Sequence, residues 1–166
     1  MALSAESQKH LKLLHILLAS TWLSSALTLT LLLACALPRA GAADRHGILL
    51  AAKFIDDWII IPSAMGLLAT SIVYSAATNW GWFRHGWIAA KWIVIVYGIL
   101  FGTFFLGPRL NSLPPIAQGL DLAAAPPAPY AANLAFVRGW GAFQFATLIA
   151  AYAFSVYKFR FRRKAK

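Results

Sequence analysis

Few side chains of this chain could carry out chemistry, and the most informative of them lie inside long apolar stretches. On a helix with 100° between residues, His15 shares a face with Ala19 and Trp22, and Lys91 shares one with Gly98. An imidazole can ligate iron or hydrogen-bond a quinone, and an ammonium can pair with an acidic substituent. A charged or polar group facing lipid is costly, so both side chains should face inward. A histidine that only bonds a carbonyl and a lysine that reaches up to the headgroups are the alternatives.

A second set of polar residues forms a stripe. Asp56, Ser63, Thr70 and Tyr74 lie on one face of an expected helix, and Gln144 is polar within another apolar stretch. Because unpaired polar groups are expensive in hydrocarbon, Ser63, Thr70, Tyr74 and Gln144 are predicted to face the centre of a helix bundle.

Two adjacent carboxylates, Asp56 and Asp57, precede the second apolar stretch. This position suggests the outer N-terminus of a helix, where the helix dipole favours negative charge. Lys53, Arg109 and Arg138 are expected at the same membrane face. The residues predict a structural ion-pair cluster, with an outer cation or proton entry site as the functional alternative.

Four apolar stretches, each about as long as a bilayer is thick, must position these residues. They make the chain an integral membrane protein with an all-α fold, an antiparallel bundle of four transmembrane helices in a single membrane domain, 1–166. The predicted helices are approximately 11–37, 56–77, 87–107 and 134–157.

The connections are expected to differ in character. Residues 38–54 are predicted to form a moderately polar outer loop. Residues 78–86 are predicted to form a short cytoplasmic turn, which makes the helices 56–77 and 87–107 antiparallel neighbours. Residues 108–133 hold six of the eight prolines, a density that argues against regular helix. An extended outer loop over the mouth of the bundle is therefore expected there.

Basic residues predict the orientation. Ten Lys and Arg side chains fall on one side of the expected helices and five on the other, which favours an N-in, C-in topology. The net charge of +10 is concentrated partly in the tail 158–166, which follows an apolar helix and suits anionic headgroups. The predicted location is the bacterial cytoplasmic (inner) membrane, as a multi-pass protein with no nucleic-acid partner.

The sequence also disfavours several kinds of chemistry. Cys35 is the single cysteine, so neither an intramolecular disulfide nor a site with several thiolates can form. The chain has no phosphate-binding glycine loop, no HExxH pair and no nucleophile elbow. Hydrolytic and nucleotide-dependent activities are therefore not expected.

Two segments carry a family resemblance, KLLHILLASTWLSSALTLTLLL and PSAMGLLATSIVYSAATNWGWFRHGWIAAKWIVIVYG. They resemble the first three helices of small bacterial membrane proteins that include the CopD-type copper-resistance domain and the HemJ-type protoporphyrinogen oxidase. The shared features are a Lys-x-x-His start with a later Trp, and a Trp and a Lys that open the third helix. The nearest match is expected to be an uncharacterised four-helix family, and the likeness covers approximately residues 9–107.

The resemblance implies haem b as a cofactor. Carried over by position, it makes His15 the metal ligand and Lys91 a functionally important cation. The second histidine of the HemJ-type proteins has no counterpart here, because Tyr97, Gly98 and Thr103 fill the corresponding region.

Two functional readings remain open, and whether the protein is an enzyme is undecided. One is a haem- or quinone-associated redox protein with a site near the cytoplasmic side, formed by His15, Trp22, Tyr74 and Lys91. The other is a non-catalytic accessory or transport-like protein without a cofactor. A homo-oligomer or a membrane partner subunit is a further expectation, with the Gly98/Gly102 pair as a docking surface.

Overall fold

The structure is a computed structural model that describes residues 3–78, 81–83, 85–118, 120 and 125–158, and every regular element in these residues is a helix. The helices form four continuous rods, each long and apolar enough to cross a membrane: Ala5–Arg39, Asp44–Ala77, Gly86–Gln118 and Ala128–Tyr157. The prediction of an all-α bundle of four membrane-spanning helices is confirmed.

Three of the rods contain a short π-helical turn. The first rod consists of α1 (Ala5–Leu31), the π turn η1 (Leu32–Ala36) and the 3₁₀ turn η2 (Leu37–Arg39). The second consists of α2 (Ala42–Ile55), the π turn η3 (Asp56–Ile60) and α3 (Ile61–Ala77). The third consists of α4 (Gly86–Phe101), the π turn η4 (Gly102–Leu106) and α5 (Gly107–Gln118), and the fourth is the uninterrupted α6 (Ala128–Tyr157).

Each π turn ends two residues before a proline, namely Pro38, Pro62 or Pro108. A proline has no N–H to donate, and its ring collides with the carbonyl four residues earlier. Inserting one residue into the turn widens the helix and accommodates the proline without ending the rod. Single π turns are also frequent at functional sites, which makes the residues of η1, η3 and η4 candidates for binding.

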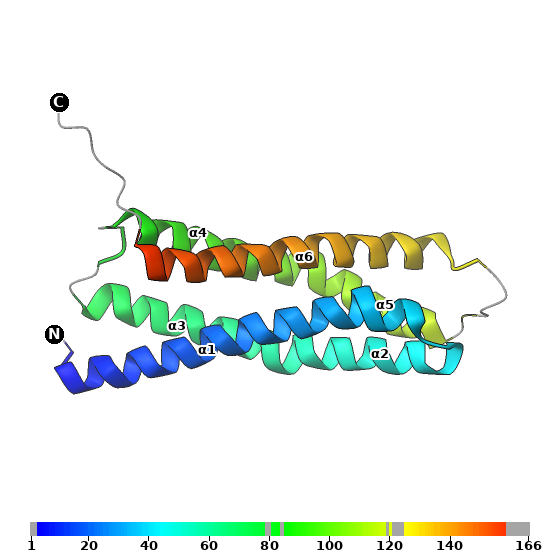
Figure 1. Cartoon of the computed structure of the whole chain (residues 1–166), viewed down its shortest axis with the longest axis horizontal. Coiled ribbons are helices and arrows are strands. Elements are labelled where there is room, and N and C mark those ends of the chain that lie inside the picture. The colour runs from blue at the N-terminus through cyan, green and yellow to red at the C-terminus, as the bar shows by residue number, and fades with distance from the viewer. Residues whose placement is uncertain (1–2, 79–80, 84, 119, 121–124, 159–166) are drawn as a thin grey trace, which may run out of the picture.

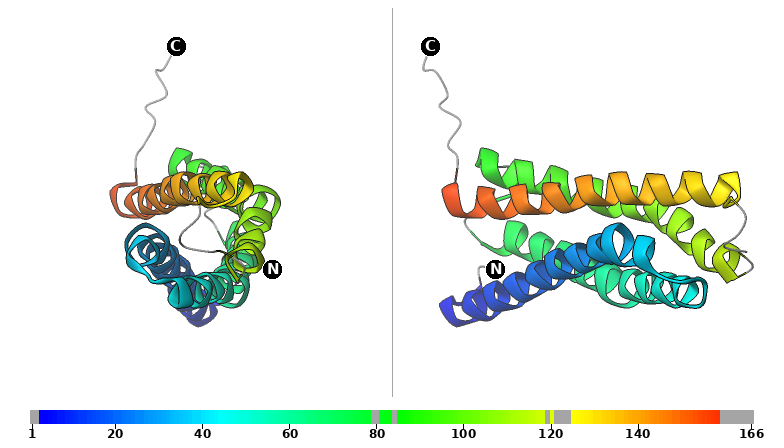
Figure 2. Two further views of the ribbon diagram at one scale, coloured as in Figure 1. Left: turned by 90° about the vertical axis from the view of Figure 1, so that its right-hand side faces the viewer. Right: turned by 45° about the vertical axis from the view of Figure 1, so that its right-hand side comes forward.

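Figures 1 and 2 show the arrangement of the rods. At one end of the bundle, α1 packs against α3 and α6, and α4 packs against α6 and α3. At the other end, α5 packs against both α2 and α6. The described parts of both termini lie at the first end, which we call the terminal end, and the opposite one is the distal end (Figure 1). The charge count predicts that the terminal end faces the cytoplasm.

The rods are longer than the sequence suggested. Ala5–Arg39 has 35 residues, about 50 Å of helix at 1.5 Å per residue, against a hydrocarbon core of about 30 Å. The expected loop 38–54 is mostly the helix α2, and the expected loop 108–133 contains α5 and the start of α6. Both loop predictions are wrong, because the helices continue beyond the apolar length needed to span a bilayer. The predicted basic tail lies outside the described residues after Lys158.

The proline density did not prevent helix formation. Pro114 and Pro115 both lie inside α5, where each removes one backbone donor. The ring Nδ1 of His46 on α2 lies 3.0 Å from the carbonyl of Pro114 and donates to it. A side chain from the neighbouring helix thus joins α2 to the proline-containing part of α5, a contact that sequence pattern alone does not predict.

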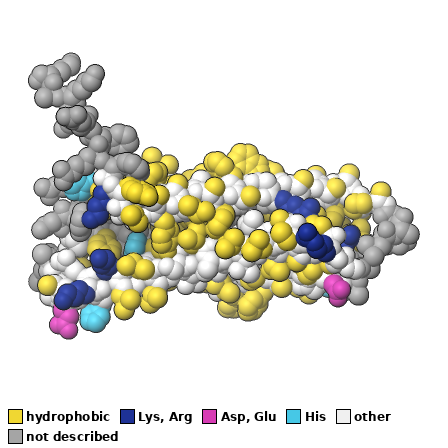
Figure 3. Space-filling view, viewed as in Figure 1, with side chains coloured by type: hydrophobic (Ala, Val, Ile, Leu, Met, Phe, Trp, Pro, Cys, Tyr) yellow, Lys and Arg dark blue, Asp and Glu magenta, His cyan; other side chains and the backbone are white. Residues whose placement is uncertain are grey.

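The outer surface of the rods is apolar. In the most apolar windows of the four rods, only 11% to 28% of residues are buried inside the protein. Large side chains such as Trp58, Ile93 and Val156 are about 70% exposed. Figure 3 shows the charged side chains toward the two ends of this face, with apolar side chains between them. Lipid is the environment that such a surface requires.

Candidate functional site

A cavity of about 740 Å³ opens at the terminal end, and we call it the terminal cavity. Residues of α1, α3, α4 and α6 line it. His15, Trp22, Tyr74 and Lys91 are all among its lining residues. The structure therefore brings together the four residues that the sequence singled out, although they come from three different rods.

His15 is held by Thr70, the middle member of the polar stripe. The Nδ1 atom of His15 lies 3.0 Å from the Thr70 hydroxyl, which itself lies 3.0 Å from the carbonyls of Gly66 and Leu67. The hydroxyl has one proton, and a carbonyl can only accept, so Thr70 donates to the backbone and accepts from His15. This network assigns the proton of the imidazole to Nδ1 and leaves the lone pair on Nε2. Nε2 is the nitrogen that could ligate a metal.

Tyr74 supports the imidazole one turn further along α3. Its ring packs edge-on against that of His15, with 5.6 Å between the centroids and an angle of 79° between the planes. Its hydroxyl donates to the carbonyl of Gln8 on α1, at 3.4 Å. His15 is thus positioned by a hydrogen bond on one nitrogen and by an aromatic contact on its ring.

Lys91 contributes a half-buried cation from the first turns of α4. Its Nζ atom lies 5.8 Å from the centroid of the Trp87 ring, a cation–π contact. The structure gives Lys91 no hydrogen bond or ion pair with any described residue. Three more lysines, Lys9, Lys12 and Lys158, line the same cavity, and the described lining residues include no Asp or Glu. The described lining of the terminal cavity therefore carries a net positive charge.

Aromatic side chains form much of its wall. Trp22 is only 2% exposed. Trp92 stacks on Trp82, with centroids 5.2 Å apart, and its Nε1 lies 3.4 Å from the Ser75 hydroxyl. Trp87, which also lines the cavity, stacks on His85 with centroids 6.2 Å apart. Flat, fixed rings suit a flat ligand.

The predicted inward orientation of the polar stripe is confirmed for its core members. Ser63, Thr70 and Gln144 are 4%, 6% and 8% exposed, and Tyr74 is half-buried.

A second cavity, of about 230 Å³, lies between the terminal and distal ends, and we call it the central cavity. Asp56, Asp57, Asn111 and Gln144 are among its lining residues, as are residues of the π turns η3 and η4. The prediction that the two aspartates stand at a helix N-terminus is wrong. Because α2 precedes them without a break, they lie in η3, in the middle of the second rod.

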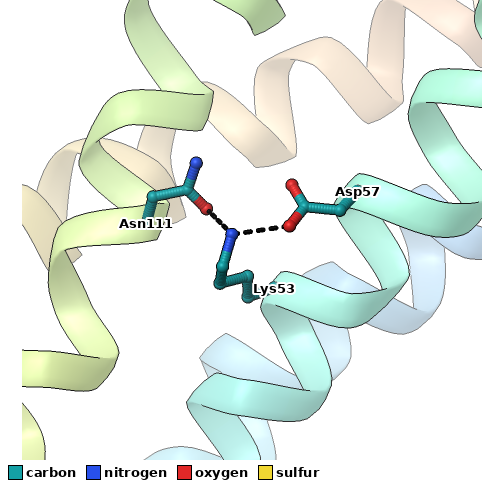
Figure 4. Close-up of polar contacts among 3 residues, drawn as sticks. All are labelled: Lys53, Asp57 and Asn111. Atoms are coloured by element: carbon teal, nitrogen blue, oxygen red, sulfur yellow. Dashed lines mark hydrogen bonds and ion pairs between the residues drawn. The ribbon is translucent and has the colours of Figure 1, made fainter.

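The predicted ion-pair cluster forms only in part. The Nζ atom of Lys53 donates to the Asp57 carboxylate at 2.5 Å and to the Asn111 side-chain oxygen at 2.9 Å, as Figure 4 shows. Arg109 and Arg138 do not join it. Arg109 donates to the Phe105 carbonyl, and Arg138 donates to the carbonyl of Leu33.

Gly98 makes close packing possible inside the protein. A Cβ atom at this position would lie 3.1 Å from the Trp22 ring and 3.5 Å from the Gln144 amide nitrogen. The sequence predicted the Gly98/Gly102 pair as a docking surface for a partner, but at Gly98 an indole and an amide of the same chain occupy the space. Gly98 is therefore buried within the protein and does not offer a surface to a partner subunit.

The fold and the two cavities define an all-α protein of the polytopic membrane class. No protein-family model, curated protein or solved structure matches the chain. The resemblance to the CopD-type and HemJ-type proteins stays a prediction.

Proposed function

We propose that the protein binds a flat, acidic amphiphile of the porphyrin type, such as haem b, in the terminal cavity and serves a redox role in the bacterial cytoplasmic membrane. The observation that carries this proposal is the combination, in one cavity, of the Lys91 ammonium and the His15 Nε2 atom, neither of which hydrogen-bonds to a described residue. Aromatic walls and a volume within the usual range of small-molecule sites support it.

The charge of the cavity favours an acidic ligand over a neutral quinone. A quinone could hydrogen-bond to His15 and Lys91, but it would bring no negative charge to pair with the Lys91 ammonium. Carboxylates of a porphyrin would pair with Lys91 and with the lysines nearer the mouth. The apolar ring system would contact Trp22 and Trp92.

The residues present fit haem with a single protein ligand. His15 would hold the iron through Nε2, while Thr70 fixes its tautomer and Tyr74 packs against its ring. The described lining residues include no second His, and neither Met nor Cys. When bound, haem would supply one-electron chemistry, and the surrounding protein would set its exposure to water.

The positive charge of the terminal end also supports the proposed orientation in the membrane. The lysines at the terminal end would lie near the anionic headgroups of the cytoplasmic leaflet, each contributing about 1 kcal/mol of attraction. This orientation places the mouth of the terminal cavity toward the cytoplasm. A homo-oligomer or partner subunit stays a separate prediction.

Haem titration of the purified, detergent-solubilised protein tests the proposal. We expect a saturable Soret band with one haem per chain. His15→Ala should abolish the axial-ligand signature, whereas His10→Ala is the matched control, because His10 is exposed and does not line the cavity. Lys91→Met should weaken binding about tenfold without moving the Soret maximum, and Lys91→Arg should restore most of the affinity.

The proposal fails if the wild-type protein gives no saturable Soret change, or if His15→Ala binds haem as the wild type does. Saturable quenching of tryptophan fluorescence by a soluble quinone, without haem binding, would favour the quinone reading. Failure of both ligands would favour the non-catalytic accessory reading.

A further inference from the structure

The amide of Gln144 has an unsatisfied oxygen in the central cavity. Gln144 is 8% exposed, and its Nε2 donates to the carbonyl of Gly98 at 3.2 Å. This bond fixes which side of the amide carries the oxygen. The Oε1 atom is buried and has no hydrogen-bond partner in the described chain. Since a buried acceptor without a partner is costly, an occupant of the cavity should supply one.

Asp56 presents a carboxylate to the same cavity. Its neighbour Asp57 is paired with Lys53, but the structure gives Asp56 no hydrogen bond or ion pair with any described residue. Within the described residues, Lys53 lies beside two carboxylates but contacts only that of Asp57, so Asp56 has no ion-pair partner of its own.

The other basic side chains of this half of the protein are engaged elsewhere. Four arginines donate to backbone carbonyls: Arg39 to Cys35, Arg45 to Ala40, Arg109 to Phe105 and Arg138 to Leu33. The guanidinium of Arg109 also lies 4.0 Å from the centroid of the Phe136 ring. None of these arginines is among the described lining residues of the central cavity. Among the residues that the structure describes, no basic side chain forms an ion pair with Asp56, so an occupant of the cavity can supply its counter-charge.

We propose that the central cavity binds a monovalent alkali-metal cation, with the Asp56 carboxylate and the Gln144 Oε1 atom as its protein ligands. Hard cations take oxygen ligands, and the cavity offers one anionic and one neutral oxygen that have no other partner. This proposal is independent of haem binding, because it uses a different cavity and different residues.

The charge and size of the cavity select a monovalent ion. One carboxylate balances a single positive charge, whereas a divalent cation would leave a net charge in an apolar setting. Among the described residues, no three His, Cys, Asp or Glu side chains gather to hold a metal ion. A volume of about 230 Å³ also leaves space for several water molecules, each of which takes about 30 Å³ in the liquid, to complete the coordination shell.

The local backbone fits this role. Asp56 is the first residue of η3, the π turn that precedes Pro62, and residues of the proline-associated π turn η4 line the same cavity. Interrupted helices are where transporters place coupling-ion sites, because the regular backbone is broken there.

Binding of radioactive ²²Na⁺ to the purified full-length protein tests the inference. The measurement is made in detergent at constant ionic strength, with choline as the replacing cation and K⁺ as competitor. We expect saturable binding of one ion per chain. Asp56→Asn should lower the affinity at least about tenfold, and Gln144→Leu should lower it by a smaller factor. Asp44→Asn is the matched control, because Asp44 is exposed and outside the cavity, and it should bind as the wild type does.

Absence of saturable ²²Na⁺ binding to the wild-type protein would overturn the inference, as would unchanged binding to Asp56→Asn. If Asp56→Asn does not fold, the thermal stability of the wild type decides the question. Its Tm should rise with NaCl or KCl relative to choline chloride at equal ionic strength. A Tm that depends on pH but not on the cation would assign the cavity to a proton instead and refute the metal ion.

Discussion

Gly98→Ala tests how tightly α4 packs against the Trp22 ring. The new methyl group would lie 3.1 and 3.2 Å from two carbons of the Trp22 ring, closer than ordinary van der Waals contact. Overpacking of this kind costs about 1–3 kcal/mol. Replacing a helical glycine by alanine returns up to about 1 kcal/mol of helix propensity. The expected net loss is about 1 kcal/mol, or a Tm lower by about 2–4 °C for a protein of this size.

The control is Gly139→Ala on α6, where a Cβ atom would meet nothing within 4 Å. At this position the substitution only increases helix propensity and causes no overpacking, so the variant should be as stable as the wild type or slightly more stable. Thermal unfolding followed by circular dichroism in one detergent compares the two variants.

A double-mutant cycle identifies the contact responsible. With Trp22→Ala as background, Gly98→Ala should no longer destabilise, because the ring that it meets is gone, and the coupling energy should be about 1–2 kcal/mol. Equal effects of Gly98→Ala in both backgrounds would show that the contact with Trp22 does not limit the packing.

Two further predictions concern the membrane and the ion pair. Reporter fusions should place a tag after residue 166 in the cytoplasm and a tag inserted at residues 125–127, between α5 and α6, outside; the reverse result would contradict the N-in, C-in topology. Lys53→Met should cost no more than about 1 kcal/mol in thermal unfolding, because the side chains of Lys53 and Asp57 are 37% and 31% exposed and the pair is screened. A loss of several kcal/mol would show that lipid, and not water, surrounds this pair.

The sequence predicted the bundle well because lipid imposes a simple rule. Only a helix satisfies its own backbone across hydrocarbon, so apolar length predicts the rods, and the 100° period predicts that Ser63, Thr70 and Gln144 face inward. The helix ends were not predicted, because beyond the bilayer the composition changes while the helix continues. One available signal was missed: Lys53 and Asp57 are four residues apart, the spacing of an ion pair on one helix.

The sequence predicted which residues form the candidate site, but it did not predict the hydrogen bonds that hold them. Inward faces pointed to His15 and Lys91, but the pairing of His15 with Thr70 depends on how α1 and α3 lie against each other. The free oxygen of Gln144 likewise follows from its bond to Gly98 on a different rod. Such contacts join residues far apart in sequence, and helical periodicity says nothing about them.

Trp22 is the only described residue that lines both cavities. The indole of Trp22 therefore contributes to the wall of the lysine-rich terminal cavity and to that of the central cavity with Asp56. A cation moving from the central cavity toward the terminal end would have to displace a 2% exposed indole and then enter a positively charged space. The electrostatics therefore favour exchange of the proposed cation through the distal end, while an acidic ligand enters from the terminal end. The proposed cation and the proposed acidic ligand would therefore reach their sites from opposite ends of the bundle. Trp22, packed against Gly98, is the side chain that borders both sites.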